Sequence, residues 1–114
     1  EMTAAVYNLV IDQGSDFAIN LTINELGSVK NLTGYSARAQ MRSTRTSTSV
    51  AGTFTCNVLS PATNGVVKMA LTNGTSSAMT PGRYFYDLEI HTNADAVVRR
   101  LIQGEVTLNP EVTR

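Results

Sequence analysis

The most reactive side chains of this sequence are one cysteine, Cys56, and one histidine, His91. Together they could form a thiol nucleophile activated by an imidazole base. Both lie in segments of alternating apolar residues, and alternate residues of a strand point to opposite faces of a sheet. Cys56 shares the apolar face of its segment with Phe54 and Val58. His91 lies on the polar face of its own segment, so we expect the pair on opposite sides of a sheet and Cys56 as an unreactive core residue.

A second candidate is the pair Asp87 and Glu89, two residues apart and therefore on one face of a strand. Two carboxylates so placed could share acid and base catalysis or hold a hard cation. We expect Arg38 and Arg42 opposite them on a neighbouring strand, with Arg99 approaching from the last strand. Cross-strand ion pairs of this kind are common surface features worth about 0.2–1 kcal/mol. We therefore favour structural pairing, with a small hydrolase as the reading that rests on these carboxylates alone.

Other motifs add no catalytic chemistry. Asn-x-Thr triplets at Asn20, Asn31 and Asn73 would suit glycosylation, but the chain is so rich in Ser and Thr that chance accounts for them. The sequence has no Gly-rich phosphate loop, no zinc-ligand spacing and no Gly-x-Ser-x-Gly turn. We predict that the protein is not an enzyme and needs neither a metal nor another cofactor.

The segment that carries the carboxylates is the clearest guide to the fold. Pro81-Gly82 signals a turn, after which Tyr84, Tyr86, Leu88 and Ile90 alternate with polar residues and Phe85. This pattern predicts a strand buried on one face. Residues 17–24 alternate in the same way, and the period of two excludes a helix there.

The same pattern predicts seven strands in all, at 4–11, 17–24, 35–42, 54–58, 67–71, 82–91 and 96–108. The polar run Ser43 to Ser49 is expected to be a loop, Asn73 to Thr80 to hold one helical turn, and Gly104 to mark a bulge. Regular strands separated by turns favour a two-sheet antiparallel sandwich, with an open barrel as the competitor. The predicted core is Phe17, Ile19, Leu21, Tyr35, Ala39, Met41, Phe54, Cys56, Met69, Leu71, Tyr84, Tyr86 and Leu88.

Composition limits the classes of function. A chain of 114 residues, 42% of them hydrophobic, suits a single domain, 1–114, with its own core. Nine basic and nine acidic residues give no net charge, so nucleic acid is not an expected partner. No apolar run approaches the roughly 20 residues of a membrane span, so we expect no membrane partner. One cysteine cannot form an intrachain disulfide, which fits folding in a reducing cytoplasm.

Several segments together resemble a known group of proteins. The Gly82-x-Tyr84-x-Tyr86 entry is similar to the sixth strand of immunoglobulin-like sandwiches, in which a tyrosine hydroxyl bonds back to the preceding corner. More widely, the chain looks like small virion proteins of tailed bacteriophages, among them immunoglobulin-like modules similar to the N-terminal domain of baseplate upper proteins. The segments that carry this resemblance are Gln13–Phe17, Asn31–Tyr35 with Arg38 and Arg42 following, Thr80–Asp87, Gly104–Val106 and Pro110–Arg114.

The resemblance implies a seven-stranded antiparallel immunoglobulin-like β-sandwich with a non-enzymatic, structural role. We expect a baseplate, tail or fibre adaptor or a capsid decoration, made in the host cytoplasm and located in the virion. Its partners would be other virion proteins, in many copies, with no small-molecule substrate. The alternative is a carbohydrate-binding module, although such modules usually present aromatic platforms and this chain has no Trp.

We expect the contacts to form on the outward face of the strands at 35–42, 82–91 and 96–108. The predicted patch is apolar at its centre, with charges of both signs around it. Two polar segments, Ser43 to Ser49 and Pro110 to Arg114, are predicted contact arms, although the tail could equally dock on its own domain. The interface candidates are Phe85, Val97, Leu101, Arg38, Arg42, Arg99, Arg45 and Arg114.

Overall fold

The computed structural model describes residues 5–113 and is mostly β-structure. No helix within that range is long and apolar enough to span a membrane. Seven strands of four or more residues form the frame: β2 (Leu9–Asp12), β3 (Phe17–Thr22), β6 (Ser36–Arg42), β7 (Gly52–Val58), β8 (Val66–Leu71), β9 (Gly82–His91) and β10 (Val98–Asn109). Shorter elements complete it: β1 (Ala5–Val6), β4 (Asn24–Glu25), β5 (Ser28–Val29), the helix α1 (Asn73–Ala78) and the 3₁₀ turns η1 (Ala62–Asn64) and η2 (Asn93–Asp95).

Each predicted strand has a counterpart, so the all-β prediction is confirmed. The predicted first strand is divided, because β1 ends at Val6 and β2 begins at Leu9. The predicted helical turn is α1, which the Thr72 side chain caps by accepting a hydrogen bond from the backbone N–H of Thr75.

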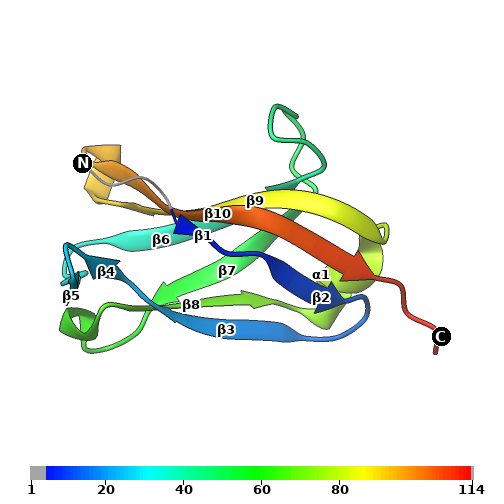
Figure 1. The fold of residues 1–114 in the computed structure, drawn as a ribbon, viewed down its shortest axis with the longest axis horizontal. Helices are drawn as coiled ribbons and strands as arrows, with labels where there is room; N and C mark the ends of the chain where they lie inside the picture. Colours follow the sequence, from blue (N-terminus) through cyan, green and yellow to red (C-terminus); the bar gives the residue numbers. More distant parts are fainter. Residues whose placement is uncertain (1–4, 114) are drawn as a thin grey trace.

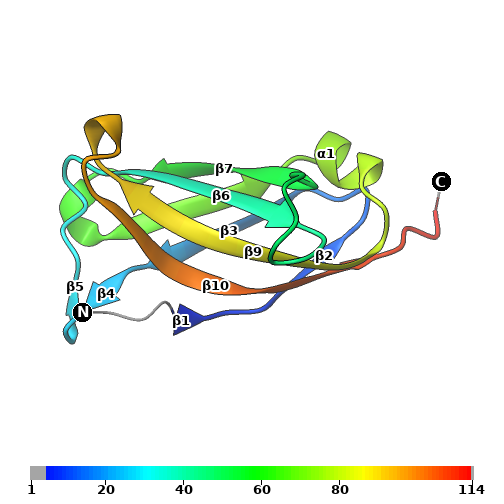
Figure 2. The same cartoon turned by 90° about the horizontal axis from the view of Figure 1, so that it is seen from above.

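The prediction of a purely antiparallel sandwich is wrong, because the sheet is mixed. The strands follow the order β1-β10-β9-β6-β7-β8-β3, and β2 also pairs with β10 (Figure 1). Both β1 and β2 run parallel to β10, whereas the other pairs along this path are antiparallel. The result is a curled half-barrel, seen from above in Figure 2.

The sheet curls at strand β7, which changes its pairing partner along its length. Its first half, Gly52 to Phe54, pairs with β6, whereas its second half, Thr55 to Val58, pairs with β8. A Cβ on Gly52 would lie 3.0 Å from side-chain atoms of both Met41 and Met79, so glycine lets two large core side chains meet at the start of β7. One strand thus belongs to both layers.

The core lies between the two halves of the curl. Leu88, Ile90, Met41, Met69 and Val106 are all fully buried. Aromatic rings cross the layers. The rings of Phe54 and Tyr86 meet edge to face with centroids 6.0 Å apart, and those of Phe17 and Phe54 are tilted with centroids 6.2 Å apart. Eight predicted core residues are buried: Ala39, Met41, Phe54, Met69, Leu71, Tyr84, Tyr86 and Leu88.

The remaining predicted core residues are half-buried, because the half-barrel is open along one side. Strand β3 is an edge strand that pairs with β8 alone, so its inward side chains keep partial contact with solvent. The residues affected on β3 and elsewhere are Phe17, Ile19, Leu21, Tyr35 and Cys56.

The corner before β9 is held by hydrogen bonds. The Tyr84 hydroxyl donates to the carbonyl of Thr80, in the preceding corner, as the resemblance to immunoglobulin-like sandwiches implies. Buried Ser76, in α1, donates through Oγ to the Ser15 carbonyl at 3.0 Å and accepts from the backbone N–H of Gly14 at 3.0 Å. These contacts fix the crossover helix against the turn between β2 and β3.

The irregularity in β10 lies elsewhere than predicted. The pairing of β10 with β9 shifts register between Arg100 and Ile102, not at Gly104. As a result Leu101 and Ile102 are both buried, and the alternation of side chains reverses along the strand. Gly104 has a different reason to be glycine, because a Cβ there would collide with the carbonyl of Tyr7.

Candidate interaction face

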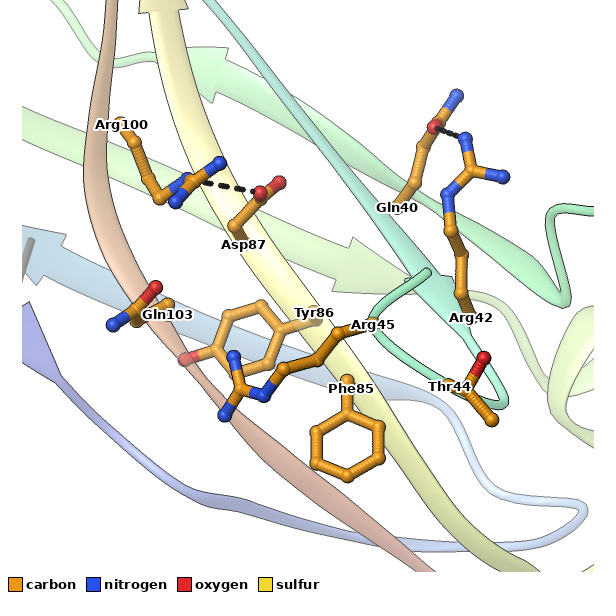
Figure 3. A pocket seen from close by; sticks show the side chains of 9 residues that line it. All are labelled: Gln40, Arg42, Thr44, Arg45, Phe85, Tyr86, Asp87, Arg100 and Gln103. Carbon is orange, nitrogen blue, oxygen red and sulfur yellow. Dashed lines mark hydrogen bonds and ion pairs between the residues drawn. The ribbon is translucent and has the colours of Figure 1, made fainter. Parts of the chain in front are cut away.

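The outer face of β6, β9 and β10 carries the polar residues of the predicted interface. Adjacent side chains on these strands are set by the registers Arg38↔Glu89, Gln40↔Asp87 and Arg42↔Phe85. The loop that follows β6 folds back over this face, where it closes a hollow of about 210 Å³ (Figure 3). Side chains around the hollow come from β6, that loop, β9 and β10: Gln40, Arg42, Thr44, Arg45, Phe85, Asp87, Arg100 and Gln103.

One end of the face is neutralised by ion pairs. Arg38 lies 3.0 Å from Glu89 and 3.4 Å from Asp95, and His91 lies 3.4 Å from Asp95. The predicted cross-strand pair of Arg38 and Glu89 is therefore confirmed.

Asp87 has a different partner from the one predicted. The Asp87 carboxylate lies 3.1 Å from Arg100. Arg42 instead lies opposite Phe85 and forms no ion pair with Asp87. Burial raises the pKa of the Asp87 carboxyl, the nearby Glu89 raises it further, and Arg100 only partly opposes them.

Two arginines of the hollow form no ion pair with a described acidic side chain, although the charge of Arg42 acts weakly on Asp87 and opposes the rise of its pKa. Arg42 donates to the Ser47 carbonyl at 3.1 Å and to the Gln40 side-chain oxygen at 3.0 Å, both neutral acceptors. The guanidinium of Arg45 lies 4.8 Å from the centroid of the Phe85 ring, a cation–π contact. Across residues 5–113 no Asp or Glu forms an ion pair with either arginine.

The predicted apolar patch does not form. Phe85 points outward as expected, but Arg45 covers its ring. Val97 is 43% exposed, yet it lies beyond the far end of β9, about 20 Å from Phe85 at the usual rise per residue. Leu101 is 8% exposed and belongs to the core, so its predicted outward position is wrong.

Arg99 and Arg100 exchange the places that simple alternation gives them. Because the register shift follows Arg100, Arg100 lies on the outer face and Arg99 reaches instead to Glu25, on β4. Glu25 also binds Lys30 at 2.8 Å, and these two cations lower the pKa of its carboxyl, the Lys30 hydrogen bond most strongly. Sequence reasoning therefore missed Arg100, and no feature of the sequence places the bulge.

The two predicted contact arms differ. The loop after β6 brings Arg45 to the face. The tail begins against its own domain, where the backbone N–H of Glu111 donates to the Gln13 side chain at 2.9 Å. Arg114, the remaining interface candidate, lies outside the described residues.

The catalytic candidates are not assembled into a site. Burial raises the pKa of the Cys56 thiol to about 11, so the thiolate is scarce at neutral pH. Cys56 packs against the core, whereas His91 pairs with Asp95 on the outer face, which confirms their predicted separation. In the described part of the chain no three His, Cys, Asp or Glu side chains group as metal ligands.

No family model matches the chain, and no curated protein matches it in sequence. Solved structures do match in fold. The N-terminal domain of ORF48 of phage TP901-1 is 14% identical with a TM-score of 0.56, over 95% of this chain and 99% of that domain. InlP of Listeria monocytogenes is 18% identical with a TM-score of 0.50, over 90% of this chain. The chain spans 26% of the InlP structure.

A family 123 glycoside hydrolase from Clostridium perfringens is more distant, at 12% identity and a TM-score of 0.43 over 24% of its chain. At their low identities the TP901-1 and InlP matches show a shared fold alone. The chain therefore has a β-rich fold that resembles the N-terminal domain of a phage baseplate protein and also part of the bacterial protein InlP.

Proposed function

We propose that the chain is a non-enzymatic structural module of a tailed-phage virion. In this proposal it acts as an immunoglobulin-like adaptor of the baseplate, tail or fibre, or as a capsid decoration. The observation that carries the proposal is the fold match to the TP901-1 domain, which covers 95% of this chain and 99% of that domain. The match therefore relates nearly all of this sequence to nearly all of that domain in fold.

The outer face supports a role in protein contacts. It combines a neutralised end around Arg38 and Glu89 with a cationic hollow around Arg42 and Arg45. Charges so arranged set the register of a partner and select among partners more than they raise affinity. Weak contacts of this kind become firm when many copies bind together in one particle.

The carbohydrate-binding alternative has less support. An aromatic ring must be open to stack on a sugar, but Arg45 covers Phe85. Tyr84 and Tyr86 point into the core. The described structure therefore presents no open aromatic platform on this face.

The test is to locate the chain in intact particles. Virions purified from a lysate of the source phage would be labelled with gold-conjugated antibody raised against the purified chain, and then imaged by electron microscopy. We expect labelling at repeated positions on the tail, baseplate, fibre or capsid. Purified virions that contain none of the chain, by labelling and by mass spectrometry, would contradict the proposal.

A further inference from the structure

The hollow on the outer face is built to hold an anion. Arg42 is fixed by two hydrogen bonds and Arg45 by the Phe85 ring, so both guanidiniums are held in place before any ligand arrives. Ordering a side chain in advance removes much of the entropy cost of binding. Arg42 and Arg45 extend along opposite sides of the hollow and Arg100 pairs with Asp87 (Figure 3). Three arginines against the single carboxylate of Asp87 leave the hollow cationic.

The size of the hollow limits the ligand to a small group. About 210 Å³ is below the roughly 300 Å³ at which sites for whole small molecules begin, but it is ample for one carboxylate side chain. The donors around it suit a carboxylate, because a guanidinium can bind both oxygens at once. Thr44 and Gln103 add neutral hydrogen-bonding groups.

A polyanion fits this surface less well than an acidic side chain. The Asp87 carboxylate stands in the wall of the hollow and repels additional negative charge. Beyond it the face is neutralised by the pair of Arg38 and Glu89, so no cationic track continues from the hollow. The chain as a whole has no net charge, and thus little long-range attraction for nucleic acid.

We propose that this hollow binds the carboxylate of a Glu or Asp side chain presented by a partner protein. Arg45 binds both of its oxygens on the side of the hollow where Gln103 lies, and Arg42, on the opposite side beside Gln40, adds positive charge (Figure 3). The proposal rests on the proposed function, which it deepens by naming the chemistry of the partner.

The probe is a capped peptide, acetyl-Gly-Glu-Glu-Gly-amide, with the Gln-Gln peptide as its uncharged match. Each is added to the ¹⁵N-labelled chain at low salt, and the NMR signals of the arginine Nε–H groups are followed. We expect the signal of Arg45 to shift with the Glu peptide and to stay in place with the Gln peptide. Shifts that are equal for both peptides, or absent up to millimolar peptide, would overturn the proposal.

Variants test which arginine binds. Because Arg45 is exposed, Arg45→Ala should fold normally and weaken binding of the Glu peptide about tenfold, as expected for the loss of a charge-assisted hydrogen bond. Arg42→Gln should weaken it less, about threefold, because Arg42 contributes charge from the opposite side of the hollow without a direct hydrogen bond. The matched control is Arg38→Ala, which removes an arginine from the neutralised end of the same face and should leave affinity within about twofold. An Arg38→Ala loss as large as that of Arg45→Ala would show general charge attraction and overturn the site.

Two further ligands test whether the hollow prefers another class of anion, a nucleic acid or an acidic sugar. A ten-residue single-stranded DNA and a glucuronate disaccharide are titrated in the same way. Tighter binding of either one than of the Glu peptide at Arg42 and Arg45 would replace the protein partner with that class and overturn the proposal. The outcome is separate from that of virion labelling: a chain found in particles whose hollow ignores the Glu peptide contradicts this inference alone.

Discussion

The hydroxyl of Tyr86 donates a 2.6 Å hydrogen bond to the backbone carbonyl of Tyr7, 79 residues earlier in the chain. The acceptor lies in the gap between β1 and β2, where the N-terminal strand is interrupted. Gly104 leaves room for that carbonyl, and the Asn8 side chain accepts from the backbone N–H of Glu105 at 3.0 Å. A buried residue of β9 thus holds the segment between β1 and β2 against β10.

Tyr86→Phe should therefore lower the free energy of unfolding by about 1–2 kcal/mol, because the mutation removes the phenol that satisfies the Tyr7 carbonyl. The measurement is chemical denaturation followed by circular dichroism. Tyr7→Phe is the matched control, since its ring is 47% exposed and its backbone carbonyl is unchanged. The control should stay within about 0.5 kcal/mol of the wild type. Equal stability of Tyr86→Phe and the wild type would exclude this role.

The sequence predicts the strands well because their alternation is a local property. Tyr84 illustrates this. Its inward position in the alternation and the nearby corner were enough to predict a hydrogen bond to backbone near the crossover between Asn73 and Thr80, and the acceptor is the carbonyl of Thr80. Leu101 illustrates the limit. A single register shift after Arg100 reverses the alternation, and it arises from how β10 pairs with β9, 10 or more residues away. Because of the same shift, Arg100 was not predicted to lie on the outer face.

The alternation of apolar and polar residues also could not predict the order and direction of the strands in the sheet. Residues 4–11 read as one strand, but their direction relative to β10 depends on contacts made at the far end of the chain. The hollow was missed for a related reason. Its cationic character depends on the path of the loop that carries Arg45 onto Phe85, and a polar run such as 43–49 gives no signal of its path.

Core substitutions should separate the closed and open sides of the half-barrel. Leu88, on the central strand β9, is fully buried, and Leu88→Ala should cost about 2–5 kcal/mol. Leu21, on the edge strand β3, is half-buried, so Leu21→Ala should cost roughly 1–2 kcal/mol. The comparison uses denaturant midpoints at constant slope. A larger cost at Leu21 than at Leu88 would show that the open side of β3 is covered in solution.

The Cys56 thiol should react slowly in the native protein. With its pKa raised from 9.0 to about 11, the thiolate fraction near pH 8 falls about 100-fold relative to an unperturbed cysteine. The rate of reaction with an aromatic disulfide reagent measures this, and the urea-unfolded chain is the control. A native rate that matches the unfolded rate would contradict the inert core assignment.

The Glu25 cluster should make stability depend on acid pH. Because Lys30, and then Arg99, lower the pKa of Glu25 in the folded state, the carboxylate stabilises folding above the pKa of the unfolded chain, near pH 4. That contribution is lost as the pH falls through the folded pKa. Glu25→Gln should thus be less stable than the wild type at pH 7, and the difference should shrink between about pH 5 and pH 3. A stability difference between Glu25→Gln and the wild type that grows as the pH falls would contradict a lowered pKa for Glu25 in the folded state.

The outer face can be tested in the particle with Phe85→Asp. The ring points away from the core, so the variant should fold, while the new carboxylate would lie beside Arg45 and neutralise the hollow. We expect incorporation into virions to fall at least about tenfold, the size of effect seen for a residue central to an interface. The matched control is Leu26→Asp, which makes the same apolar-to-acidic change at a side chain that is 93% exposed in the turn between β4 and β5. Folding of both variants is checked by circular dichroism, and incorporation is measured by immunoblot of purified particles. If Phe85→Asp is folded and assembles as well as Leu26→Asp, partners bind elsewhere, and the exposed edge of β3 becomes the next surface to test.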